Sequence, residues 1–152
     1  MKRTEKRLRF CAVLLVLNLL FIWGNSLMPG SVSGAISGWI RDVLASIFHG
    51  RMDAPDAGHG LIRKLAHFME FACLGALFTW LYAMLQKPVW LALACGGAAA
   101  VADESIQCFI PERGPSVRDV LIDSCGVMLG IGIVIAINVI FHKKKQFGGT
   151  IK

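Results

Sequence analysis

Residues 117–141 decide the fold of this chain: they read VRDVLIDSCGVMLGIGIVIAINVIF, and no charged residue follows Asp123 within them. A helix needs roughly 20 mostly apolar residues to cross the hydrocarbon core of a bilayer. Residues 8–28 read LRFCAVLLVLNLLFIWGNSLM and satisfy the same requirement. This stretch is longer than the apolar core of a typical signal peptide, and no clear small-residue cleavage site follows it. Both stretches therefore predict membrane-spanning helices.

The composition extends this prediction to the whole chain. Of the 152 residues, 55% are hydrophobic and 17% are charged, whereas a soluble domain has about 25% charged residues. Two further apolar stretches, residues 61–85 and 89–109, are long enough to cross a membrane, although they contain charged residues. Length and pattern predict a single all-α domain over residues 1–152, a small membrane bundle of about four transmembrane helices.

The segment between the first two spans has a different pattern. Within residues 29–60, apolar side chains recur at helical spacing, namely Ile36, Ile40, Val43, Leu44 and Ile47. Polar residues occupy the other faces. This pattern predicts one short, outer amphipathic helix at the membrane interface. A helix that packs over the spans is the alternative interpretation.

The positive charges predict the orientation of the bundle. The net charge is +6, and the basic residues gather at the two ends of the chain, as Lys2, Arg3, Lys6, Arg7 and Arg9 and as Lys143, Lys144 and Lys145. Each cluster adjoins an apolar run, which is typical of cytoplasmic ends that face anionic membrane lipids. We therefore expect a multi-pass protein of the cell membrane with both termini cytoplasmic, and no nucleic-acid partner. The five cysteines form no CxxC pair, so neither a disulfide nor a zinc site is expected.

Charged and polar residues interrupt three of the predicted spans at one depth. With the termini cytoplasmic, all of these residues lie in the outer half of the bilayer, namely Lys64, His67 and Glu70, then Asp103, Glu104 and Gln107, then Asp119 and Asp123. An ionised side chain at the centre of a span costs about 2.5–3.5 kcal/mol on insertion scales, so such residues are expected to face one another and not lipid. Gly126 and Gly130 continue the stripe of Asp119 and Asp123, and small residues let helices approach closely.

Several of these residues also have structural interpretations. Ser116 and Asp119 have the spacing of a helix capping box. Lys64, expected in the first turn of its helix, could pair with Glu104, while Arg63 and Arg118 could be interfacial anchors. His67 could be an interior histidine with a hydrogen-bond partner. A carboxyl group as deep as Glu70 or Asp103 either has a partner or is held in its neutral form.

Two motifs resemble those of the VanZ-like family of bacterial membrane proteins. The first is Lys64-Leu-Ala-His67-Phe-Met-Glu70 with Gly75, and the second runs from Asp103-Glu104 through Gln107, Pro111, Arg113 and Ser116 to Asp119, Asp123 and Gly126. The similarity covers roughly residues 60–130. It implies a four-span envelope protein, with a possible link to resistance against the glycopeptide teicoplanin. Phe71 stands where the family usually has Tyr, and Asp123 where it usually has Asn, which puts the role of position 123 in doubt.

The residues support three hypotheses for function. The first is an enzyme or binder acting on a lipid-linked or cell-wall precursor group in the outer leaflet, in which the candidate catalytic residues are His67, Glu70 and Asp103. The candidate substrate-binding residues are Lys64, Glu104, Gln107, Arg113, Ser116, Arg118, Asp119 and Asp123. The second is a non-enzymatic envelope binding or interaction protein, and the third, ranked last, is a small proton-coupled transporter. A metal held by His67, Glu70 and Asp103 is a less favoured variant of the first hypothesis. The residues leave any cofactor unknown, and a homo-oligomer stays open because Gly126 and Gly130 could pack within one chain or between two.

Overall fold

The computed structural model describes residues 2–48, 57–114 and 116–147, and this part of the chain is built from helices. The prediction of an all-α fold is therefore confirmed. Residues 49–56 of the predicted outer loop lie outside the described part. The helices are α1 (Lys2–Ser26), α2 (Gly30–Phe48), α3 (Ala57–Met84), α4 (Trp90–Gln107) and α5 (Val117–Phe147).

Among the described residues, three helices are long and apolar enough to cross a membrane: α1, α3 from Leu61 to Met84, and α5 from Val117 to Phe141. The remaining predicted span, residues 89–109, corresponds to α4, which has 18 residues and includes two carboxylates, Asp103 and Glu104. These findings make the chain a membrane protein. The count of four spans and the cytoplasmic position of both termini stay predictions.

The start of α3 differs from the expected start in a way that matters for the site. α3 begins at Ala57, four residues before the predicted boundary. Lys64 therefore lies about two turns inside the helix and not in its first turn, as the sequence suggested. The positive end of the helix dipole, which acts within the first turn, is too far away to be the main influence on the Lys64 ammonium group.

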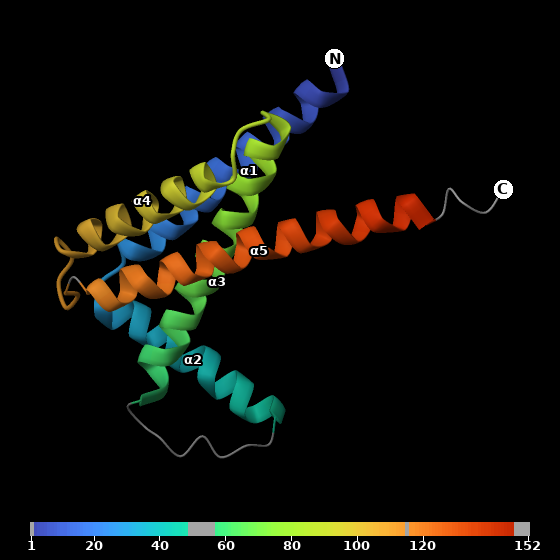
Figure 1. Ribbon diagram of the computed structural model, residues 1–152. Helices are drawn as coiled ribbons and strands as arrows, with labels where there is room; N and C mark the ends of the chain where they lie inside the picture. Colours follow the sequence, from blue (N-terminus) through green and yellow to red (C-terminus); the bar gives the residue numbers. More distant parts are fainter. Residues whose placement is uncertain (1, 49–56, 115, 148–152) are drawn as a thin grey trace.

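Figure 1 shows how the helices meet. α5 crosses α3 near the middle of both helices, and α4 runs beside α1 on one side of this crossing. The end of α1, the end of α4 and the start of α5 lie together on the side where α2 leaves the bundle. α2 packs against α3. The polar residues that were predicted to share one depth come from this side of the bundle.

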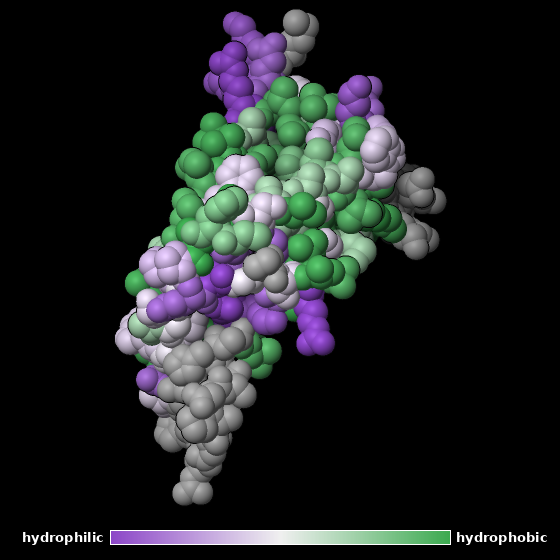
Figure 2. Space-filling model, turned by 90° about the vertical axis from the view of Figure 1, so that its left-hand side faces the viewer, coloured by the Kyte–Doolittle hydropathy of each residue, from purple (hydrophilic) through white to green (hydrophobic). Residues whose placement is uncertain are grey.

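The outer surface of the bundle is strongly apolar. Large side chains such as Val13 and Leu20 on α1 and Ile133 and Ile140 on α5 are exposed. Figure 2 shows a broad hydrophobic band with hydrophilic groups above and below it. A soluble protein rarely exposes so large an apolar surface, whereas a bilayer covers it without cost.

α2 packs against α3, as in the alternative interpretation considered for it, and its position at the membrane interface stays a prediction. Ile36 and Val43 are partly exposed. Ser37 is buried, and its hydroxyl donates a hydrogen bond within α2 to the Ser33 carbonyl at 2.9 Å. The side chains of Leu44 and Ile47, also part of the predicted pattern, lie outside the described residues.

The crossing of α3 and α5 is closed by glycines. A Cβ atom on Gly126 or Gly130 would overlap the backbone of α3 at Phe68 or Ala72, and one on Gly75 would overlap the backbone of α5 at Val127. Phe71, Leu74 and Val127, all fully buried, fill the space around this contact. Gly126 and Gly130 therefore pack within one chain, which answers the question that the sequence left open about them.

We expect Gly130→Ala to lower the free energy of unfolding by about 1–3 kcal/mol, because the added methyl group forces the two backbones apart. The measurement is reversible unfolding of the protein in lipid nanodiscs. Gly132→Ala is the matched control on the same helix, because nothing lies within 4 Å of its added Cβ. An alanine there should leave stability unchanged or raise it by up to about 1 kcal/mol. Equal effects of the two changes would contradict the close crossing.

Candidate functional site

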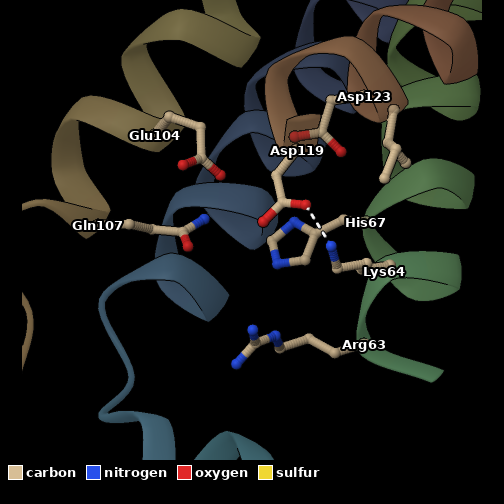
Figure 3. Close-up of a pocket in the computed structure, with 8 residues that line it drawn as sticks. Arg63, Lys64, His67, Glu104, Gln107, Asp119 and Asp123 are labelled. Atoms are coloured by element: carbon tan, nitrogen blue, oxygen red, sulfur yellow. Dashed lines mark ion pairs between the residues drawn. The ribbon is translucent and has the colours of Figure 1, made fainter. Parts of the chain in front are cut away.

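Polar side chains from three helices face one another near the start of α5 (Figure 3). They surround a cavity of about 10 Å³, room for roughly one water molecule. Six of the residues predicted for the site line this cavity, namely Lys64, His67, Glu104, Gln107, Asp119 and Asp123. Arg63 and Ile122 complete its wall. The structure thus brings together, from α3, α4 and α5, residues that lie up to 59 positions apart in the sequence.

Lys64 and Asp119 form an ion pair between α3 and α5. The distance from Lys64 Nζ to Asp119 Oδ1 is 2.7 Å (Figure 3). The alternative partner considered for Lys64, Glu104, is engaged elsewhere. The Lys64 side chain is 40% exposed, so the pair contributes little net stability and mainly fixes the relative position of the two helix ends.

Glu104 satisfies the backbone at the start of α5. One of its carboxylate oxygens accepts a hydrogen bond from the Ser116 amide N–H at 2.8 Å. The Ser116 hydroxyl in turn accepts a hydrogen bond from the Asp119 amide N–H at 3.4 Å. One of the two hydrogen bonds of the predicted capping box is therefore present, the one from the Asp119 amide to the Ser116 hydroxyl. In the other, the Ser116 amide donates to Glu104 and not to the Asp119 carboxylate. This leaves the Asp119 carboxylate free to pair with Lys64.

His67 lies between two carboxylates. Its Nδ1 atom is 3.9 Å from Glu70 Oε2 and 3.9 Å from Asp103 Oδ2. Both distances are too long for hydrogen bonds, and Nδ1 has no hydrogen-bond partner among the described residues. The three candidate catalytic residues are therefore adjacent, with His67 positioned to exchange a proton with a small group that enters between them.

α1 supplies two polar residues that the sequence analysis did not single out. The Asn25 side-chain amide donates a hydrogen bond to Glu70 Oε1 at 2.9 Å. The Gln107 side-chain amide lies 2.8 Å from Asp103 Oδ2 and 3.3 Å from the Ser26 hydroxyl, and donates to both. The sequence signal for these contacts was the presence of two adjacent polar residues, Asn25 and Ser26, at the end of an apolar span.

A larger cavity of about 260 Å³ lies beside the first, between α1, α2 and α3. Arg63, His67, Glu70 and Arg113 contribute its charged and titratable groups. One Arg113 nitrogen, Nη2, donates to the Asn25 carbonyl at 3.2 Å, while Nε and Nη1 are buried and have no hydrogen-bond partner among the described residues. Burial and the nearby charge of Arg63 lower the pKa of the Arg113 guanidinium group. An anion in this cavity would relieve both effects.

The remaining predicted residues occupy different environments. Arg118 is exposed and lines neither cavity, in keeping with the interfacial anchor considered for it. Phe71, at a position where the related family usually has Tyr, is fully buried in the apolar core. Asp123 is 2% exposed and lines the small cavity, so a carboxyl group stands there in place of the amide of an Asn.

A family model described as VanZ/LLP1 matches residues 10–141, which is most of the chain. No curated protein and no solved structure matches it.

The contacts distinguish Glu104, which binds the backbone of α5, from Asp103 and Glu70, which lie beside His67. Measurements of stability can test this distinction. We expect Glu104→Ala to lower the free energy of unfolding by about 1–3 kcal/mol, because the Ser116 amide loses its buried partner. Asp103→Asn and Glu70→Gln should leave stability unchanged or raise it, because groups held for chemistry are often strained in the folded protein. Thermal unfolding in nanodiscs measures all three. A large loss of stability in Asp103→Asn would mean that this carboxylate mainly holds the bundle together.

Proposed function

The chain belongs to the VanZ/LLP1 family, and we propose that it is an envelope membrane protein that binds the anionic group of a lipid-linked molecule, such as a cell-wall precursor, in the outer leaflet. The favoured group is a phosphate or pyrophosphate. The proposal rests on one observation above all: two arginines, Arg63 and Arg113, border the same cavity within a membrane protein.

Neither guanidinium group forms an ion pair with a carboxylate of the described residues at 4.0 Å or less. Two cations that share a poorly hydrated cavity repel each other, and a buried cation without a partner is costly. A phosphate group with several acceptor oxygens can bind both guanidinium groups at once, each through charge-assisted hydrogen bonds. The two arginines therefore favour an anionic ligand over a neutral one.

The rest of the cavity suits the apolar part of a lipid. The cavity is lined by Phe21 from α1, Met28 from the connection between α1 and α2, Ile36 and Ile40 from α2, and Ile62 from α3. Small-molecule sites commonly combine mostly apolar walls with a few polar groups that set the orientation of the ligand. A phosphate held by the arginines would leave its hydrocarbon chain against these side chains.

His67 lines both cavities and gives the site a means of modifying its ligand. We propose His67 as the general acid or base, with Glu70 and Asp103 as the adjacent carboxyl groups that exchange or orient its proton. Lys64, Gln107, Asp119 and Asp123 would form the polar wall on the other side of His67. Arg118 and Ser116 have no direct role in this proposal, because Arg118 is exposed and Ser116 caps α5.

A non-enzymatic binding protein is the second candidate function. It is supported by the contacts of Lys64 and Glu104, which tie the helix ends together and leave fewer groups for chemistry. In either form, capture of a cell-wall precursor would change the target available to a glycopeptide of the teicoplanin type, and reduced sensitivity to that antibiotic would follow. Transport ranks last because the charged groups that line the two cavities lie at one end of the bundle and not near its middle.

We expect Arg63→Gln and Arg113→Gln each to weaken the binding of a polyprenyl phosphate by about tenfold or more, because each change removes a charge-assisted hydrogen bond from a buried anion. The measurement is native mass spectrometry of the protein released from nanodiscs that contain polyprenyl phosphate at graded amounts. The uncharged polyprenol is the matched lipid control, and exposed Arg118→Gln is the matched protein control. Equal binding of phosphate and alcohol, or an equal loss in Arg118→Gln, would contradict the proposal.

A further inference from the structure

Three groups at the small cavity have the chemistry of a metal site; two of them line the cavity, and the third, Asp103, lies next to these two. His67, Asp103 and Asp123 each offer one ligand atom, and these atoms lie within 4.8 Å of one another. They come from α3, α4 and α5, the three helices that meet at this point. We propose that His67, Asp103 and Asp123 bind a divalent transition-metal ion, Mn²⁺ or Zn²⁺. The proposal does not depend on the lipid ligand argued above, and a metal ion on His67 and Asp103 would replace the acid–base role proposed for these two residues.

Asp103 and Asp123 are buried, which distinguishes them from a cluster of acidic residues on the surface. Asp103 is fully buried, and its Oδ1 atom has no hydrogen-bond partner among the described residues. Asp123 is 2% exposed and lines the small cavity. A buried carboxylate oxygen without a partner is costly, and a metal ion would satisfy Asp103 Oδ1 while it also binds the Asp123 carboxylate.

The neighbouring contacts resemble those that orient metal ligands. The Gln107 amide donates to Asp103 Oδ2, which fixes this carboxylate and leaves Oδ1 free. Ser26 accepts a second hydrogen bond from the same amide and so fixes Gln107. Hydrogen bonds from an outer shell of residues are a regular feature of protein metal sites, because they set the orientation of the ligands.

The charge balance of the cluster also favours a dication. Three cations, Arg63, Lys64 and Arg113, face five carboxylates in the two adjoining cavities and their walls, namely Glu70, Asp103, Glu104, Asp119 and Asp123. With every group ionised, two negative charges remain in excess in a region of low dielectric. One divalent ion would neutralise them. Two bound protons would do so as well, and direct measurement of metal binding separates these cases.

The ligand set narrows the choice of ion. The imidazole nitrogen favours transition metals, Zn²⁺ above all, and the two carboxylates are ligands that both Zn²⁺ and Mn²⁺ accept. Ca²⁺ prefers six to eight oxygen ligands, and Mg²⁺ usually keeps several of its waters. The site should therefore bind Mn²⁺ or Zn²⁺ more tightly than Ca²⁺ or Mg²⁺.

The test is metal binding to the full chain in nanodiscs after chelation, by equilibrium dialysis against Mn²⁺ or Zn²⁺ alone. We expect the wild-type protein to retain an equimolar amount of one of these ions. Asp103→Asn and Asp123→Asn should each weaken binding by about tenfold or more, and Gln107→Leu by a similar factor. Glu112→Gln is the matched control, because this exposed glutamate lies outside the cluster and its replacement can still accept the Ser31 amide hydrogen bond. No retention by the wild type, or equal retention by all variants, would overturn the proposal.

A second measurement does not rely on variants of the site. The chain has four histidines, and replacement of His49, His59 and His142 by Gln leaves His67 as the single imidazole. Pulsed electron paramagnetic resonance of bound Mn²⁺ should then still show coupling to an imidazole nitrogen. Loss of that coupling, with Mn²⁺ still bound, would exclude His67 as a ligand and overturn the site. Because neither experiment measures the binding of a polyprenyl phosphate, failure here is distinct from failure of the proposed function.

Discussion

The close approach of α3 and α5 is the constraint on which the rest of the structure depends. Gly75, Gly126 and Gly130 allow the two backbones to touch, and the contact begins within one turn of the polar cluster, where Gly126 meets Phe68. It places His67 opposite Asp123 across the interface. If the helices were separated by the width of one more methyl group at the glycines, the groups of both cavities would move apart. Packing in the apolar half of the bundle thus determines the geometry of its polar half.

Helical periodicity and alternating direction were sufficient to predict which residues meet. Lys64, His67, Gln107 and Asp123 were expected at one depth from spacing and orientation alone, and the structure places them around one cavity. The fold class followed from the same information, because long apolar runs have few alternatives to helices in a membrane. Residue spacing on straight helices carries this kind of information well.

The individual partners could not be read from the sequence. Lys64 pairs with Asp119 because Glu104 is already bound to the Ser116 amide, and this depends on the path of the chain between α4 and α5. Asn25 and Ser26 were missed, and Arg63 was interpreted only as an interfacial anchor, for a related reason: each stands near the end of an apolar run, where polar residues are ordinary. Their contribution depends on how α1 and the first turns of α3 are placed beside Arg113.

The composition of α4 has a consequence for how the chain enters the membrane. Its 18 residues include Asp103 and Glu104, so the transfer of this helix alone into the bilayer is less favourable than the transfer of α1, α3 or α5. The polar groups that offset this cost are on other helices: Ser116 at the start of α5 for Glu104, and the α3 and α5 faces around Asp103. α4 can therefore settle stably only with its neighbours. During biosynthesis, insertion of α4 into the lipid should be delayed until α5 has been synthesised, and the two helices should then insert together.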